Sequence, residues 1–273
     1  YTITIPQGED ARLVIDVHAE EGASAAFLFR LEKGASLSLT WKLTGGDREG
    51  TCVLAAYYEL AEDARLHVSR LESGLTKTII YDQRHSVLAA RARADFYAAE
   101  LGGEKIIVHS YGKLSGDASE MNERAIYAGR GKQHLDFFYH IDHVGKKTKA
   151  EIDLKGALAD ESKKIFRGTL DFKRGCAGSV GDEGDFAIQL DPKTKNISLP
   201  LLLCTEDDVQ GNHASSAGQL DQNTIYFLMS RGFTLEEARR IVVEALIRPI
   251  IDGMDETIRE EVLTAVREKL DRE

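Results

Sequence analysis

Apolar and polar residues alternate along about three quarters of the chain, from Tyr1 to about Cys204. Apolar side chains recur at every second position, which is the period of a β-strand with one buried face. No long segment in this part has the 3.6-residue period of a helix. The alternation is clearest in Leu13/Ile15/Val17, Phe27/Phe29/Leu31, Leu37/Leu39/Trp41/Leu43 and Phe137/Tyr139/Ile141. The pattern therefore predicts a mainly β structure built from many short strands.

The turns between the first predicted strands repeat at a regular spacing. Asp10-Ala11, Gly22-Ala23 and Gly34-Ala35 follow one another at 12-residue steps, so 24 residues separate the first pair from the third. A period of about 20 to 25 residues in β sequence is typical of a solenoid, in which each coil stacks on its neighbour. A β-sandwich also contains many short strands. The turn spacing therefore favours a solenoid only modestly.

Helical sequence begins where the β pattern stops. Asp221 is placed to cap a first helix and Gly232 to end it. Thr234 and Glu237 have the spacing of a capping box for a second helix, which we expect to end before Pro249. Its expected buried stripe is Ala238, Ile241, Val242, Ala245 and Leu246. A last helix, 252–270, has a narrow apolar stripe of Ile258, Val262, Val266 and Leu270.

Glycine occurs at every third position from Gly175 to Gly184, and this polar segment predicts a flexible loop between coils. Cys176 lies in it, so we expect this thiol to be exposed. Cys52 and Cys204 lie in apolar runs, where we expect buried, inert thiols. Three widely spaced cysteines without a CxxC motif fit a reducing cytosol better than a disulfide framework.

Charge and hydropathy exclude some functions. The chain has 35 Lys and Arg against 45 Asp and Glu, a net charge of −10. Nucleic acids and anionic membranes need basic surfaces, so neither is an expected partner. No apolar run approaches the about 18 residues of a membrane span, and no leader pattern is visible. No P-loop or hydrolase motif is present, so we expect no enzyme activity from this chain.

A segment of small residues, 209–218, precedes the helices, and His213 carries its only ring. Small side chains allow a close approach of another backbone, so this segment is a candidate docking site. A lone histidine in such a segment is most often structural. It is also a candidate ligand, because a neutral imidazole nitrogen is available near neutral pH.

Two blocks of motifs lie in the second half of the chain. The first block consists of His140-Ile141-Asp142-His143, Thr148, Lys155-Gly156, Phe166 and Gly168. The second block consists of Pro200-x-Leu202, Asp207-Asp208-Val209, His213, Gly218-Gln219-Leu220-Asp221, Tyr226, Ser230-Arg231-Gly232 and Glu237-Ala238. In order and spacing, over about a hundred residues, the two blocks resemble the SufB/SufD family of iron–sulfur cluster assembly proteins, and the His213 motif is nearer to SufD.

The resemblance implies a fold and a role. The fold would be a right-handed parallel β-helix over residues 1–215, followed by a helical domain over residues 216–273. The chain would be a cytoplasmic scaffold in iron–sulfur cluster assembly or transfer, paired with a second copy of itself or with a SufB-like subunit. An ATPase of the SufC type would drive the complex. The sequence does not decide whether the partner is a second copy, a SufB-like subunit or both, nor whether a flavin takes part.

The resemblance also implies functional residues. His213 would help to build a transient cluster at the subunit interface, with no cluster held stably by this chain alone. The helical region would bind the ATPase. The alternative is a purely structural role, in which the helices form a cap that closes the open end of the solenoid. The candidate ATPase-binding residues are Tyr226, Ser230, Arg231, Gly232, Glu236, Glu237, Arg239 and Arg240.

The chain departs from the family at three ligand positions. SufD-type proteins usually have a cysteine where this chain has Gly211, and SufB-type proteins have a glutamate where it has Ala214. The scaffold cysteine of SufB aligns with Gly184. A structural or interaction module that has lost its metal-handling residues is therefore the alternative function. A polysaccharide-degrading solenoid would need clustered carboxylates with exposed aromatic rings, and no convincing cluster is visible.

His140 and His143 have the spacing of an HxxH metal site, with His134 nearby. On a strand, residues 140 and 142 face one side and residue 143 faces the other, so the two imidazoles diverge. We therefore expect structural roles for them rather than a zinc site.

Overall fold

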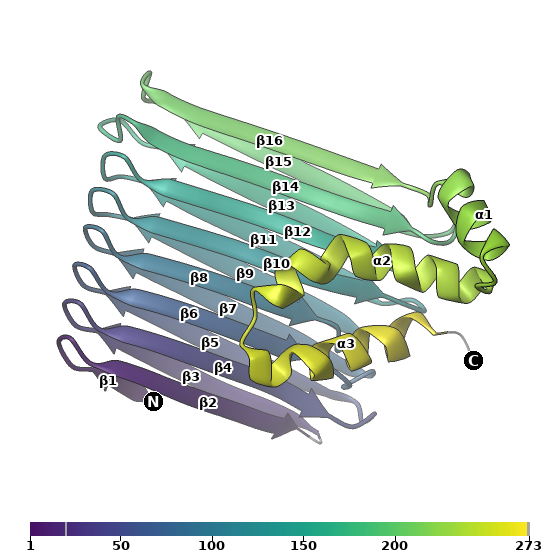
Figure 1. The fold of residues 1–273 in the computed structure, drawn as a ribbon. Coiled ribbons are helices and arrows are strands. Elements are labelled where there is room, and N and C mark those ends of the chain that lie inside the picture. Colours follow the sequence, from purple (N-terminus) through teal and green to yellow (C-terminus); the bar gives the residue numbers. More distant parts are fainter. Residues whose placement is uncertain (20, 272–273) are drawn as a thin grey trace.

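Two parallel sheets of eight strands each form the body of the molecule in the computed structural model (Figure 1). The structure describes residues 1–19 and 21–271. The chain passes alternately between the sheets. The sheet that we call the odd sheet contains β1 (Thr2–Ile5), β3 (Gly22–Leu31), β5 (Gly50–Leu60), β7 (Thr78–Leu88), β9 (Lys105–Leu114), β11 (His134–His143), β13 (Lys163–Phe172) and β15 (Lys195–Cys204).

The second sheet, which we call the even sheet, runs in the same spatial order. It contains β2 (Asp10–Ala19), β4 (Ser36–Gly45), β6 (Arg65–Glu72), β8 (Arg93–Glu100), β10 (Glu120–Gly129), β12 (Lys149–Leu158), β14 (Ser179–Gln189) and β16 (Val209–Gly218). Each strand pairs in parallel with the strand two places along the chain. The fold is therefore a parallel β-solenoid, and the predicted fold class is confirmed.

A complete coil of the solenoid contains more residues than the turn spacing predicted. Thr2 pairs with Leu28, which makes a coil of 26 residues, and Lys163 pairs with Lys195, which makes one of 32. The expected period of 20 to 25 residues is therefore wrong. Most strands keep a length near ten residues, and the additional residues lie in the turns. The 12-residue steps mark single strands with their turns, and two such units make one coil.

The solenoid interior is filled by the alternate side chains that the sequence marked as apolar. Trp41, Phe29, Phe96 and Phe137 are at most 1% exposed. Paired residues of neighbouring coils stack directly, as Phe29 does on Tyr58 with ring centroids 5.2 Å apart. Burial of each such side chain stabilises the fold by about 2 kcal/mol. The alternation therefore sets which face of every strand points inward.

A cluster of charged side chains lies inside the solenoid. Asp82 Oδ2 accepts hydrogen bonds from Arg70 and Arg84, each 2.6 Å long, and Arg84 also donates to Glu100 at 2.6 Å. Burial raises the pKa of Glu72 next to them, and the charge of Glu100 raises it further. Buried ion pairs add little net stability, but loss of one partner leaves an uncompensated charge. The cluster therefore restricts which residues can occupy these coils.

Three helices follow β16: α1 (Gln222–Ser230), α2 (Leu235–Asp252) and α3 (Glu256–Leu270). The Asp221 cap and the Thr234–Glu237 capping box are both present, as predicted. The expected end of α2 before Pro249 is wrong, because α2 continues through Pro249 to Asp252. The expected stripe is also only partly right, since the buried residues of α2 are Ala238, Val243, Ile247, Ile250 and Ile251. Packing of the last two explains why the helix continues past the proline.

The helices α2 and α3 lie across the outer face of the even sheet and contact β6, β10 and β12 (Figure 1). Ile247, Ile251, Ile258 and Val262 form a second core with a few outward-facing residues of the sheet, such as Ile126. The interpretation of the helices as a cap over the open end is therefore wrong. They cover a flank, where the sheet offers apolar side chains on its outer face. None of the helices in the described part of the chain is long and apolar enough to cross a membrane.

Gly253 joins α2 to α3 directly over the ring of Tyr97. A Cβ at Gly253 would lie 2.1 Å from Tyr97 Cε1, although the backbone conformation itself (φ −81°) suits any residue. Only glycine therefore allows the helices to pack this closely on the sheet.

We predict that Gly253→Ala lowers the free energy of unfolding by about 1–3 kcal/mol, because the methyl group displaces the helices or the ring. Urea unfolding measures the change. Gly46→Ala is the matched control, since a Cβ there meets nothing within 4 Å. In a Tyr97→Ala background, the Gly253→Ala cost should largely disappear. Equal effects of Gly253→Ala and Gly46→Ala would contradict the prediction.

Candidate functional site

The C-terminal end of the solenoid is formed by two strands that each have one unpaired edge. Within the described residues, β15 pairs only with β13, and β16 pairs only with β14. Nearly every residue of β16 is exposed, although each lies within a ten-residue strand. An unpaired edge of this length presents a row of free backbone donors and acceptors. This end is therefore one place at which another strand can bind.

His213 lies in the middle of β16, and its side chain belongs to the inner face of the terminal coil. It pairs in register with Glu183 of β14, and residues paired in register on parallel strands point to the same face. Glu183 is only 4% exposed, whereas His213 is exposed because no coil follows β16. The imidazole therefore stands at the mouth of the solenoid interior.

Glu183 is a buried carboxyl group directly below His213. Its Oε1 atom has no hydrogen-bond partner among the described residues. Burial, followed by the charge of Asp185, raises the pKa of Glu183 to about 7. Asp185 is itself paired with buried Lys164, whose pKa is lowered by burial. The mouth of the interior thus contains an imidazole and a carboxyl group that changes charge near neutral pH.

The three positions at which the resemblance implied ligands lie on two different faces. Gly211 belongs to the inner face with His213, and a Cβ there would lie 2.8 Å from Leu202 Cδ2. Gly184 and Ala214 pair with each other in register and lie on the outer face of the even sheet. Within β16, the inner face therefore carries His213 and no cysteine.

The environments of two cysteines differ from the prediction. Cys176, expected to be exposed, is fully buried, and burial raises the pKa of its thiol. Cys204, expected to be buried, is exposed at the end of edge strand β15 and donates to the Glu206 carbonyl at 2.9 Å. Cys52 is buried, as predicted.

The glycine-rich segment explains the Cys176 error. It is not the expected flexible loop, because Gly181 and Gly184 lie within β14, and only Gly175 and Gly178 lie in a turn. The turn folds Cys176 inward. Cys204 is exposed for a different reason, since β15 has no following coil to cover it.

The HxxH pair diverges as predicted. His143 points inward, stacks on Phe172 with centroids 4.3 Å apart, and shares a hydrogen bond of 2.7 Å with Thr148. Burial lowers the pKa of His143 to about 4. His140 lies on the outer face and contacts Asp142. His134 stands at the start of the same strand, β11. The two imidazoles of the motif therefore cannot bind one ion together.

Helix α1 exposes a group of large apolar side chains. Tyr226 is 76% exposed and Phe227 is 54% exposed, while Ile225 is the residue that anchors the helix. The Arg231 guanidinium lies over the Phe227 ring, 5.2 Å from its centroid. Met229 and Phe233 are exposed as well, and we call these four apolar residues the α1 patch. Exposed apolar patches of this kind mark sites of protein contact.

The other predicted partner-binding residues have different surroundings. Glu237 is used in the capping box, and Arg240 is paired with Asp271, 2.9 Å away. Glu236 is exposed and Arg239 is partly exposed on the first turns of α2. Ser230 donates to the Phe227 carbonyl at 2.7 Å, and Gly232 has a left-handed backbone (φ +98°) that ends α1. Glu237, Arg240, Ser230 and Gly232 thus have structural contacts of their own.

The comparisons with known proteins agree with this architecture. The family model of the SUF system FeS cluster assembly SufBD core domain matches residues 14–246. The chain is 26% identical to the iron-sulfur cluster assembly protein SufD of Bacillus subtilis over 204 residues, which are 74% of this chain and 46% of that protein. It is 25% identical to a SufBD family protein of Mycobacterium leprae over 216 residues, which are 76% of this chain and 55% of that protein.

The described part of the chain is a β-solenoid with open terminal strands and a flanking helical pair. The match over most of its length shows that the chain belongs to the SufB/SufD family of iron–sulfur cluster assembly proteins. It spans about half the length of the two relatives just described.

We predict that Glu183→Gln changes how stability depends on pH. Because the pKa of Glu183 is raised from 4.5 to about 7, the folded state holds a proton that the unfolded state releases between these values. This carboxyl group therefore lowers the free energy of unfolding as the pH rises from about 4.5 to about 7. Urea unfolding should show the variant gaining stability relative to the wild type over that range. A constant difference between the two proteins would contradict the prediction.

Proposed function

We infer that this chain is a SufD-like scaffold subunit of a cytoplasmic SUF complex that assembles or transfers iron–sulfur clusters. The observation that carries the proposal is the position of His213, on the inner face of a terminal strand that has one unpaired edge. An imidazole nitrogen there can bind iron of a nascent cluster. Three unpaired cysteines fit a reducing compartment.

The proposed cluster is cargo held at a subunit interface. The inner face of β16 offers His213 but no thiolate, because Gly211 stands at the position of the SufD-type cysteine. The remaining ligands would come from a partner docked on the unpaired edges of β15 and β16, where strands can be added by backbone hydrogen bonds. A SufB-like chain or a second copy of this chain has the matching solenoid edge. This chain alone would neither hold a cluster stably nor turn over a substrate.

The proposed motor is an ATPase of the SufC type that binds the helical region. The α1 patch supplies exposed aromatic anchors, and aromatic residues dominate binding energy at protein interfaces. Arg231, Glu236 and Arg239 would add charge complementarity around it. Because α2 is packed on the even sheet, a force applied at α1 would be transmitted to the solenoid.

The second candidate is a structural or interaction module without a role in cluster chemistry. The observation that favours it is the loss of ligand side chains at Gly184, Gly211 and Ala214. Anaerobic reconstitution with iron and sulfide, with and without a SufB-like partner and the ATPase, separates the two. Cluster formation that requires this chain supports the scaffold, and formation that is indifferent to it supports the module.

We predict that Tyr226→Ala with Phe227→Ala abolishes co-purification of the ATPase, because the change removes the aromatic anchors of the α1 patch. We expect binding to weaken by at least about a hundredfold, as for two interface hot spots. Val14→Ser is the control, since it removes another exposed apolar side chain, on the outer face of β2. Retained ATPase binding by the double variant would refute this docking site.

We predict that His213→Ala impairs cluster maturation while the protein remains folded, because the side chain is exposed and contributes little to the core. Asn212→Ala is the matched control, because Asn212 is the next residue on β16 and points to the opposite face, where it donates to Asp182 at 2.9 Å. Absorbance of the reconstituted complex measures the cluster. Equal maturation by the two variants would make His213 structural.

A further inference from the structure

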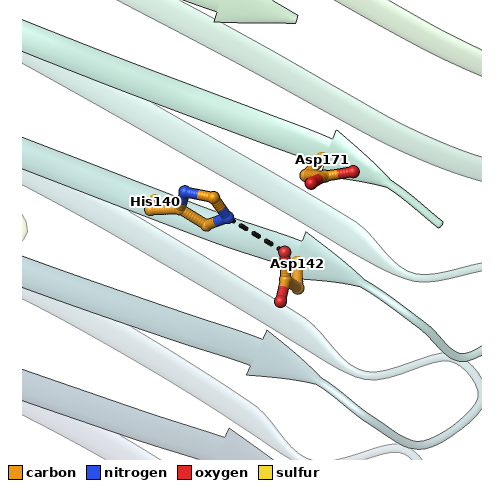
Figure 2. A group of neighbouring side chains, drawn as sticks. All are labelled: His140, Asp142 and Asp171. Carbon is orange, nitrogen blue, oxygen red and sulfur yellow. Dashed lines mark hydrogen bonds and ion pairs between the residues drawn. The ribbon is translucent and has the colours of Figure 1, made fainter. Parts of the chain in front are cut away.

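A histidine and two aspartates lie together on the outer face of the odd sheet. They are distant in sequence from His213, which lies on the inner face of the even sheet. His140 and Asp142 belong to β11, and Asp171 belongs to β13 (Figure 2). Asp142 and Asp171 pair in register, so their side chains stand side by side. Both aspartates are buried, at 8% and 7% exposure, whereas His140 is partly exposed.

The donor atoms of this cluster already have nearly the spacing of metal ligands. One imidazole nitrogen and one oxygen from each carboxylate all lie within 4.8 Å of one another. Two donors bound to one ion at about 2.1 Å each are about 3.0 Å apart when adjacent and at most about 4.2 Å apart. His140 Nε2 and Asp142 Oδ1 are 2.9 Å apart. The His140–Asp142 pair thus already has the spacing of adjacent ligands, and the Asp171 side chain would have to move closer to them to complete the site.

The surrounding residues hold these donors in place. Tyr111 donates a hydrogen bond to Asp142 Oδ2, which leaves Oδ1 directed toward His140. The His140 ring also packs against Tyr111, with centroids 5.4 Å apart. Burial opposes ionisation of Asp142, but the hydrogen bonds from Tyr111 and His140 outweigh it, and the pKa lies below its usual value. Hydrogen bonds to the ligating groups are a regular feature of metal sites.

One protein cation now lies between the two carboxylates. The Lys173 ammonium is paired with Asp171 Oδ2 and lies 3.4 Å from Asp142 Oδ1. Its side chain is 43% exposed, so it can swing into solvent without unfolding the sheet. Two carboxylates and one ammonium leave a net negative charge in a mostly buried place. A divalent cation that displaced Lys173 would neutralise both carboxylates.

We propose that His140, Asp142 and Asp171 bind one divalent transition-metal ion of the Fe²⁺, Mn²⁺ or Zn²⁺ class, in exchange for the Lys173 ammonium. One imidazole and two carboxylates suit these borderline ions, and water would complete the coordination. The site is separate from His213, and it does not rest on the proposed role in cluster assembly.

The test is calorimetric titration of the purified chain with Zn²⁺, repeated with Co²⁺ as a spectroscopic probe, in the absence of sulfide and of any partner. The wild type should bind one ion that His140→Ala and Asp171→Asn weaken by at least about tenfold. Lys173→Met should strengthen binding by about tenfold, because it removes the competing cation. Tighter ion binding by Lys173→Met cannot result from misfolding. The proposal can therefore still be tested if an aspartate variant is unstable.

Two matched controls lie on the same face of the odd sheet. His85→Ala removes a histidine from the same row of residues as His140, and Asp136→Asn removes an aspartate that is paired with Arg167. Both should bind the ion as the wild type does. An ion held elsewhere, for instance at Cys204 or His213, would persist in every variant. The proposal is overturned if the wild type and Lys173→Met both fail to bind, or if His140→Ala binds as the wild type does.

Discussion

The in-register stacking of parallel strands is the constraint on which the rest of this structure depends. Because each residue lies directly above its counterpart in the neighbouring coil, a side chain that points inward in one coil points inward in the next. The stacks Phe29–Tyr58 and His143–Phe172 fill the interior on this principle. The same rule places His213 above Glu183 and Asp142 beside Asp171. One geometric rule thus builds the core, the mouth of the interior and the outer-face cluster.

Stacking also explains why the ends of the solenoid matter. A coil in the middle has both of its edges satisfied, whereas β15 and β16 each lack one neighbour. The helices do not relieve this, because α2 and α3 pack on the flank of the even sheet and leave the terminal strands uncovered. The described residues therefore offer several surfaces for contact, among them the open strand edges, the α1 patch and the outer face of the odd sheet.

Sequence reasoning reached the fold class, the helix caps and the family, because these depend on local signals. Alternation over two residues defines a strand face, and Asp221, Thr234 and Glu237 act within one helical turn. It failed where tertiary packing decides. Pro249 does not end α2, since Ile250 and Ile251 beyond it are buried against the sheet. The environments of two cysteines also depend on tertiary structure: a turn folds Cys176 inward, and no following coil covers Cys204. The pairing of Asp142 with Asp171 needed the register, which the irregular coil length of 26 to 32 residues hides from the sequence.

The placement of α2 and α3 across the flank has a consequence for how the molecule opens. In a stack of coils each coil contacts only its neighbours, so unravelling can begin at either end and proceed one coil at a time. The helices cross several strands and contact both β6 and β12, so these coils can separate only after the helices detach. Transient opening should therefore be confined to the outermost coils, and the last of these carries His213. The terminal strand β16 can thus detach from its neighbour while the coils in the middle of the solenoid stay paired.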